Sequence, residues 1–193
     1  DLTQATSLEE IGYETFYGAP LTSIKFNEGL KRIGDYAFGG SELSGSLELP
    51  NSLESIGDYA FDYCRLTSVK LPSSVTTIGS NAFSSNQLTT VTIPNSVTAI
   101  GYYAFYGNQL TTLEIPSSVT TIGSNAFSSN QLTSIQLSEN LTTIGSSAFY
   151  RNKLTTVIIP NSVTTIETQA FYQNPNLTTI TIKRSDSTGI TLG

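Results

Sequence analysis

The sequence contains no histidine, tryptophan or methionine, and it has one cysteine. Without a second cysteine, no disulfide bond can form within the chain. Without histidine, catalytic triads that use an imidazole base are excluded. Charged residues make up 12% of the 193 residues, which is about half of the usual share. We therefore expect a protein that is not an enzyme and that uses no cofactor or metal.

Long hydrophobic runs and an excess of basic residues are also absent. The apolar runs are only a few residues long, whereas a helix that spans a membrane needs about 18 residues. The chain carries 9 basic and 15 acidic residues, a net charge of −6. A negative chain is repelled by nucleic acids and by anionic lipids. We therefore expect neither nucleic-acid binding nor direct membrane insertion.

One short phrase returns along nearly the whole chain. Phenylalanine recurs at intervals of 22 or 23 residues, and the residues around it recur with it. Residues 73–89 return without change as residues 117–133. The recurring phenylalanines are Phe16, Phe38, Phe61, Phe83, Phe105, Phe127, Phe149 and Phe171. A fixed period of this length is typical of repeats that stack on one another.

Each repeat unit divides into three pieces. Residues 66–71 alternate apolar and polar side chains at their end, which predicts a short strand, and Pro72 ends it. Residues 75–78 predict a second, shorter extended segment, and Gly79 permits a tight bend after it. Residues 80–86 are too few for a stable helix and predict one helical or 3₁₀ turn.

A second column of recurring residues lies three positions after each phenylalanine. Asparagine can donate to and accept from the backbone of neighbouring coils. Cys64 occupies the same position one unit earlier. We therefore interpret this cysteine as a buried structural residue and not as a reactive thiol. The asparagines of the column are Asn86, Asn108, Asn130, Asn152 and Asn174.

The repeated pattern L-x-x-[IV]-x-[LI]-P-x-S-[LV]-x-x-I-G-x-x-A-F-x-x-[NC] resembles the BspA-like leucine-rich repeat family of bacterial surface proteins. The resemblance covers Leu8 to Ile182, with Glu167 in place of the glycine in the last full copy. It implies a leucine-rich repeat solenoid, a right-handed stack of coils around a parallel β-sheet with short second extended segments. It also implies a secreted or cell-surface location and the recognition of a host or neighbouring-cell protein.

The whole chain, residues 1–193, is expected to form a single leucine-rich repeat domain. A partial first repeat covers residues 1–20, full repeats cover residues 21–176, and a partial last repeat covers residues 177–193. Because the first and last copies are partial, we expect the chain to be a segment of a longer protein. We also expect the chain to be a monomer.

The outward positions of the predicted strands form the first candidate ligand-binding surface, as in other solenoids. An alternative interpretation of Lys25, Glu48 and Lys70 is a ladder of charges that pair with one another across the strands. The column consists of Lys25, Glu48, Lys70, Thr92, Glu114 and Gln136, followed by Ile158 and Thr181.

Tyrosines form the second candidate, with Tyr102, Tyr103 and Tyr106 in one unit. Tyrosine is enriched at interfaces because it combines a large apolar area with a polar tip. The alternative is that these rings only cover the phenylalanine column. The sequence leaves both interpretations open.

Acidic residues are candidates for metal ligands or for a catalytic pair. Asp35, Asp58 and Asp62 could hold calcium, but no coordinating loop signature is present, and solvated acids on one edge are the favoured interpretation. Glu48 and Glu114 lie at equivalent positions three coils apart, about 14 Å by strand spacing. That separation exceeds the roughly 6.5–9.5 Å of an inverting glycosidase pair.

The resulting functional hypothesis is a non-enzymatic module for protein recognition or adhesion in a secreted or cell-surface protein. One alternative is a structural repeat spacer, natural or designed, that has no specific ligand. The other alternative is a carbohydrate-binding module that uses the hydroxyl-rich strands and the tyrosines.

Overall fold

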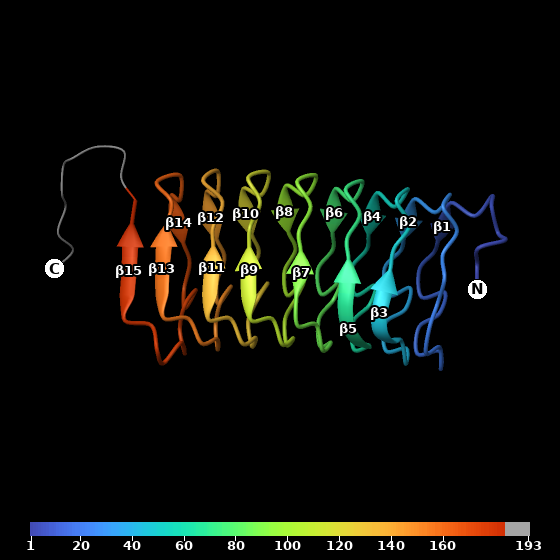
Figure 1. Cartoon of the computed structure of the whole chain (residues 1–193), viewed down its shortest axis with the longest axis horizontal. Helices are drawn as coiled ribbons and strands as arrows, with labels where there is room; N and C mark the ends of the chain where they lie inside the picture. Colours follow the sequence, from blue (N-terminus) through green and yellow to red (C-terminus); the bar gives the residue numbers. More distant parts are fainter. Residues whose placement is uncertain (184–193) are drawn as a thin grey trace.

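The computed structural model describes residues 1–183, which wind into successive coils along one axis (Figure 1). In each complete coil the chain rises through a front strand, turns at the top, descends behind it and returns below (Figure 1). The coils advance from right to left in that view, so the winding is right-handed. Residues 184–193 of the predicted partial last repeat lie outside the described residues.

The back of the stack is one parallel sheet of eight two-residue strands, in the order β1-β2-β4-β6-β8-β10-β12-β14. Adjacent strands pair in register one repeat apart, for example Ile56 with Ile78. This sheet confirms the predicted second extended segment. Its strands are β1 Glu10–Ile11, β2 Arg32–Ile33, β4 Ser55–Ile56, β6 Thr77–Ile78, β8 Ala99–Ile100, β10 Thr121–Ile122, β12 Thr143–Ile144 and β14 Thr165–Ile166.

The front strands are also parallel, and they pair in three groups, β3-β5-β7, β9-β11 and β13-β15. Side chains alternate between the interior and solvent, so that in β5 Val69 is buried while Lys70 is exposed. These are the strands that the alternating pattern predicts. They comprise β3 Ser44–Glu48, β5 Arg65–Lys70, β7 Val91–Thr92, β9 Thr112–Glu114, β11 Ser134–Gln136, β13 Thr156–Ile159 and β15 Thr179–Ile182.

The eight recurring phenylalanines form one continuous stack through the core. Neighbouring rings lie 5.2–5.7 Å apart between centroids and are close to parallel. Six of them, from Phe38 to Phe149, are fully buried. Each coil thus contributes its ring to an interior shared with its neighbours, which no single coil could form.

The segment after each recurring glycine is a pair of turns, which corrects the predicted helical or 3₁₀ turn over residues 80–86. No helix occurs anywhere in residues 1–183. Asn81 and Ser85 have positive φ angles of 55° and 54°, and a left-handed residue interrupts helical winding. The N–H groups of Asn81, Phe83 and Ser85 donate to carbonyls of the next coil at 2.8–2.9 Å. Hydrogen bonds between coils therefore take the donors that a helix would use.

The asparagine column ties each coil to the one before it. Asn108 accepts the N–H of Leu88 at 3.0 Å and donates to the carbonyls of Phe83 at 2.9 Å and Phe105 at 3.2 Å. Cys64 is buried at the equivalent place and donates to the carbonyl of Phe38. Burial raises the pKa of the Cys64 thiol, which agrees with its predicted structural role.

The recurring glycines lie where successive backbones approach most closely. A Cβ at Gly101 would lie 2.8 Å from the carbonyl carbon and oxygen of Gly79, closer than side-chain carbons come to backbone. In the last full copy Glu167 occupies this column. Its carboxylate accepts hydrogen bonds from the backbone N–H and the hydroxyl of Ser146, both at 2.9 Å.

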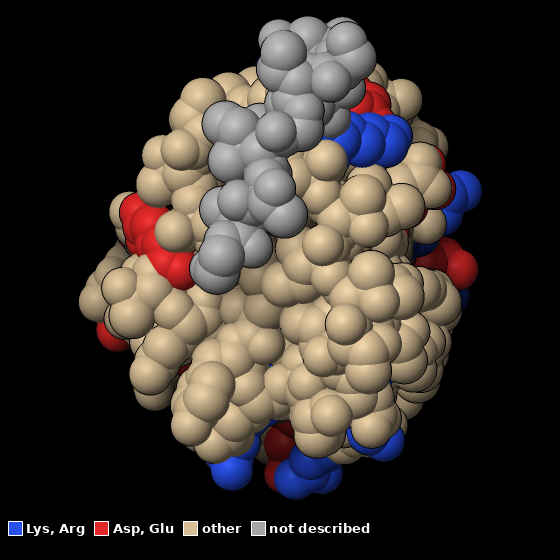
Figure 2. Space-filling view, turned by 90° about the vertical axis from the view of Figure 1, so that its left-hand side faces the viewer, with Lys and Arg blue, Asp and Glu red and all other residues tan. Residues whose placement is uncertain are grey.

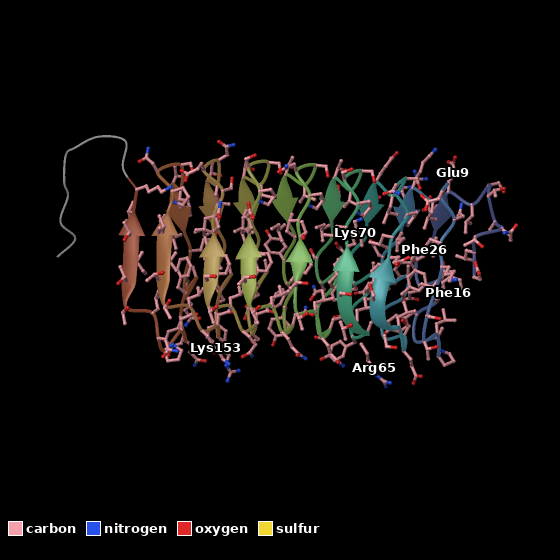
Figure 3. All side chains as sticks on the ribbon, viewed as in Figure 1. Glu9, Phe16, Phe26, Arg65, Lys70 and Lys153 are labelled. Atoms are coloured by element: carbon pink, nitrogen blue, oxygen red, sulfur yellow. The ribbon has the colours of Figure 1, made fainter. Side chains whose placement is uncertain are left out.

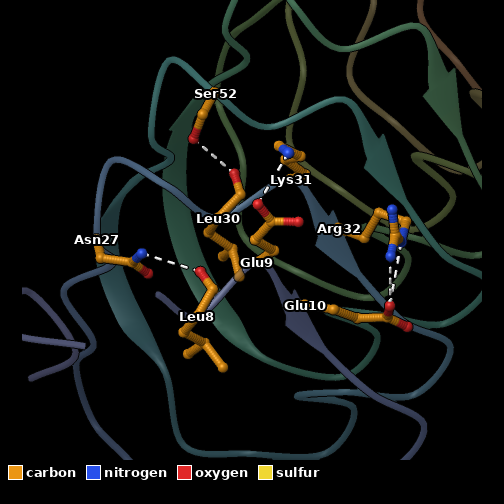
Figure 4. Close-up of polar contacts among 8 residues, drawn as sticks. All are labelled: Leu8, Glu9, Glu10, Asn27, Leu30, Lys31, Arg32 and Ser52. Atoms are coloured by element: carbon orange, nitrogen blue, oxygen red, sulfur yellow. Dashed lines mark hydrogen bonds and ion pairs between the residues drawn. The ribbon is translucent and has the colours of Figure 1, made fainter. Parts of the chain in front are cut away.

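Polar contacts also join the first coils, as Figure 4 shows. Asn27 donates to the carbonyl of Leu8 at 2.9 Å, and Ser52 donates to the carbonyl of Leu30 at 2.6 Å. Two exposed ion pairs lie beside them, Lys31–Glu9 at 2.9 Å and Arg32–Glu10 at 2.7 Å. Exposed pairs contribute about 0–1 kcal/mol each, so the contacts to backbone carbonyls bind the coils more firmly.

Charged side chains gather around the rim of the molecule in the view onto its C-terminal end (Figure 2). Residues 1–183 contain no helix that could cross a membrane.

Candidate binding surface

The predicted outward column lies on one exposed face, which we call the front face. The strand pairings place Glu48 beside Lys70, Lys70 beside Thr92, and Glu114 beside Gln136. Lys25 precedes the first of these strands, in a segment that is not itself a strand. All six predicted residues are exposed. The row therefore exists as predicted, and all of its members except Lys25 lie on paired parallel strands.

The charges of this row do not pair with one another. No ion pair within 4.0 Å joins Lys25, Glu48 or Lys70 among residues 1–183, although Glu48 lies opposite Lys70 on the adjacent strand. Figure 3 shows Lys70 at the upper end of β5, away from Arg65 at the lower edge. Three unpaired charges of alternating sign thus face solvent on neighbouring coils.

Two grooves lie along the front face. The first has a volume of about 880 Å³ and includes Lys25, Glu48 and Lys70 in its lining. The second has a volume of about 620 Å³ and is lined partly by Glu114 and Gln136. Three charged residues of the predicted column line the first groove, whereas one, Glu114, lines the second. Both grooves are partly open to solvent.

The three predicted tyrosines belong to a different surface. They lie in the turn segment between β8 and β9, where Tyr103 and Tyr106 meet edge to face with ring centroids 5.5 Å apart. Tyr102 borders a groove formed by the back sheet. The structure therefore does not bring these rings together with the charged column of the front face.

A second group of tyrosines, which was not predicted from the sequence, lies on the turn segments of the first three coils. Tyr13, Tyr17, Tyr36 and Tyr59 contact one another there. A signal was present, because Tyr36 and Tyr59 both stand two residues before a recurring phenylalanine. That spacing places them at the same point of adjacent coils.

The acidic residues considered as metal ligands hold backbone groups instead. Asp35 Oδ1 accepts the N–H of Asp58 at 2.8 Å, and Asp58 Oδ1 accepts the N–H of Ser80 at 2.6 Å. Within residues 1–183, no three acidic or cysteine side chains come together as a metal site would require. Desolvation raises the pKa of Asp62, which lies four residues after Asp58.

The comparison with known families decides what these coils are. The BspA type leucine rich repeat region matches the chain in six copies, over residues 9–131 and 99–191. The chain belongs to the BspA-type leucine-rich repeat family. This assignment confirms the resemblance read from the repeated pattern.

Solved structures place this BspA-type repeat protein among bacterial relatives. It is 27% identical to the pneumococcal vaccine antigen PcpA, with a TM-score of 0.51 over 92% of this chain and 60% of that one. It is 28% identical to a leucine-rich repeat protein from Eubacterium ventriosum, with a TM-score of 0.57 over 93% of this chain and 53% of that one. The BspA-type chain thus spans little more than half the length of these relatives.

A leucine-rich repeat protein from Bacteroides ovatus shares the fold at 22% identity, with a TM-score of 0.51 over 90% of this chain and 64% of that one. Among curated proteins, no sequence matches this BspA-type chain.

Proposed function

We propose that this solenoid is a non-enzymatic protein-binding module of a secreted or cell-surface bacterial protein, and that it acts in adhesion through its front face. The unpaired row of Lys25, Glu48 and Lys70 over the larger groove carries the proposal. Exposed charges on adjacent coils, two of them on paired strands, give a partner protein complementary charges to pair with. The description of PcpA as a vaccine antigen supports the surface location.

Surface plasmon resonance against a panel of extracellular matrix proteins tests this proposal. The informative variant exchanges two charges of the row, Glu48→Lys with Lys70→Glu, so that the net charge is unchanged. We expect at least tenfold weaker binding, because the pattern of charges is inverted at the centre of the groove.

The matched control exchanges the pair Arg65–Glu42, which lies 4.0 Å apart and outside the front-face grooves. Arg65→Glu with Glu42→Arg should leave the affinity within twofold. Equal weakening by both exchanges would contradict the larger groove as the contact site, because Arg65 lies at the other end of β5 from Lys70. Binding to a glycan array and to no protein would favour the carbohydrate-binding alternative, and no binding at all would favour the spacer.

A further inference from the structure

The tyrosines of the first three coils form one packed group, which we call the tyrosine platform: Tyr13, Tyr17, Tyr36 and Tyr59. Tyr36 and Tyr59 stack with ring centroids 4.5 Å apart and planes 5° from parallel. Tyr13 and Tyr17 each meet Tyr36 edge to face, at 5.9 and 6.0 Å. Tyr13 is 66% and Tyr17 57% exposed. The rings therefore hold one another in place while much of their surface faces solvent.

The backbone conformation positions the rings of the tyrosine platform. Tyr36 and Tyr59 both have a φ of 56°, and the left-handed conformation recurs at this point of each turn segment. Gly39 lies under Tyr17, because a Cβ there would meet the tyrosine ring at 3.2 Å. Since little side-chain freedom remains to be lost, a ligand that contacts these rings meets a preorganised surface.

Acidic residues surround the tyrosine platform. Glu14, Asp35 and Asp58 are exposed. Interaction with the Glu14 carboxylate raises the pKa of Tyr13, and the charged groups that raise the pKa of Tyr36, after desolvation, include Asp58 and Asp35. The tyrosine platform thus combines aromatic rings with a local negative potential.

The nearest base in the sequence is already engaged. Arg32 lies 2.7 Å from Glu10, and the acidic groups that raise its pKa are Glu10, Glu54 and Glu9. Asp35 and Asp58 instead accept backbone N–H groups, so one oxygen of each carboxylate is used within the fold. No ion pair within 4.0 Å involves Asp35 or Asp58 among residues 1–183.

We propose that the tyrosine platform is a second binding surface, separate from the front face, that takes an arginine- or lysine-rich segment of a partner protein. A guanidinium or ammonium group is attracted to the face of a tyrosine ring, and the surrounding carboxylates strengthen that attraction. Arginine fits best, because its planar group can stack on a ring while it donates hydrogen bonds to a carboxylate.

Another coil of the same chain supplies a natural control. Tyr103 and Tyr106 also meet edge to face, 5.5 Å apart, but between residues 71 and 138 the only charged residue is Glu114. This pair therefore has aromatic rings without the acids. If rings alone were enough, both places would bind a basic segment equally.

Fluorescence anisotropy with a labelled hexa-arginine peptide at 50 mM salt tests the proposal. The first variant changes Tyr13→Leu and Tyr17→Leu, which keeps apolar contact and removes the ring electrons. We expect at least fivefold weaker binding. Tyr13→Phe with Tyr17→Phe should stay within twofold of the unmodified chain, since a phenyl ring also attracts cations.

A second variant changes Asp35→Asn and Asp58→Asn, which keeps an acceptor for each backbone N–H and removes both charges. Binding should again weaken at least fivefold. The control variant, Tyr103→Leu with Tyr106→Leu, and the front-face exchange of Glu48 and Lys70 should each stay within twofold. The failure of the tyrosine platform is therefore distinguishable from that of the front face.

Two results would overturn the proposal. In the first, the Tyr13 and Tyr17 leucine variant binds hexa-arginine as tightly as the unmodified chain while the aspartate variant does not, which means that charge alone attracts the peptide. In the second, the Tyr103 and Tyr106 variant weakens binding as much as the variant of the tyrosine platform. Circular dichroism of each variant shows whether it is folded. If the leucine variant does not fold, the aspartate variant provides the test, and unchanged binding by it would overturn the proposal.

Discussion

Single side chains in this protein supply hydrogen-bond partners for backbone groups that the short strands leave unpaired. Asn108 shows this most clearly, because its amide serves groups of two coils at once and is itself buried. Short strands of two to six residues pair only part of each coil, so buried N–H and C=O groups elsewhere need side-chain partners. Cys64 serves the same position, with contacts from its thiol to the Ser41 hydroxyl and to the carbonyls of Phe38 and Asp62.

Replacement of Asn108 by alanine should destabilise the fold by roughly 2–3 kcal/mol, because the N–H of Leu88 and the carbonyl of Phe83 lose their partner inside the protein. Denaturant unfolding followed by circular dichroism measures the change. Gln109→Ala, one residue further on and exposed, serves as the control and should change the free energy of unfolding by less than about 0.5 kcal/mol. Equal effects of the two substitutions would mean that the asparagine column is not a stabilising ladder.

Asp62 is a residue whose charge works against the fold. Its Oδ1 is buried without a hydrogen-bond partner, and desolvation raises the pKa of the carboxyl above its ordinary value of 3.8. Because the folded state disfavours the ionised form, Asp62→Asn should stabilise the protein at pH 7, by about 1 kcal/mol.

The pH dependence follows from the sign of this shift. The gain from Asp62→Asn should be complete above the raised pKa of the folded state. It should disappear as the pH falls toward 3.8, where both folded and unfolded chains bind the proton. Unfolding curves of both proteins between pH 3 and pH 7 measure this; a gain that is constant over the range would contradict the assignment to Asp62 ionisation.

At the scale of the element, contact between coils overrides local preference. The turn segments have the length and composition of a single helical turn, yet alternate N–H groups in them, such as those of Asn81 and Phe83, donate to the next coil. The same closeness explains the glycines that precede them, because a side chain there would meet the backbone of the previous coil. The short distance between successive coils therefore explains both the conformation of the turn segments and the glycine that recurs before each of them.

Gly101→Ala should destabilise the protein by about 2 kcal/mol or more, because the new methyl group would lie 2.8 Å from Gly79 backbone atoms and the coils would have to separate. Thermal unfolding monitored by circular dichroism gives the comparison. Gly12→Ala is the matched control, since the nearest atom to its Cβ, the hydroxyl oxygen of Thr15, lies at 3.8 Å. A similar loss at both positions would argue that backbone freedom, and not the distance between coils, requires glycine.

At the scale of the whole molecule, the protein is a line of equivalent coils whose interior passes from one to the next. Stability in such a line is close to a sum over coils and over the contacts between neighbours. The front face and the tyrosine platform are also products of this stacking. Each brings together side chains from adjacent coils, for example Glu48 with Lys70 and Tyr36 with Tyr59, which are 22 and 23 residues apart in sequence.

Removal of one complete coil should therefore leave the fold intact. Deletion of residues 101–122 joins Ile100 to Gly123, which restores the same local sequence, and the denaturant m-value should fall by about a tenth. Deletion of residues 101–111 removes half a coil and should prevent cooperative folding, because every following strand loses its register. If the two deletions were equally stable, the coils would not be the units of the structure.

Much of the fold could be predicted because each contact between neighbouring coils recurs once in every repeat of the sequence. The stacked Phe83 and Phe105, the Asn86 column and the buried Cys64 all follow from position within the repeat. The turn at Asn81 could not be predicted from local preference, because its conformation depends on acceptors in the next coil. Positions of the front-face residues were predicted correctly, but the absence of ion pairs among them depends on side-chain geometry that a repeat pattern does not contain.

The amino-acid sequence alone determined that the chain winds into coils, which side chains point inward and which residues share a column, because a 22-residue period leaves one way to bury the apolar positions together. Only the tertiary structure decided which charges stay unpaired on the front face and that Tyr13 and Tyr17 pack against Tyr36 from the neighbouring coil. The reason is physical: the period sets the order of the side chains along each coil, whereas the distances and directions between coils arise only once the backbones hydrogen-bond to one another.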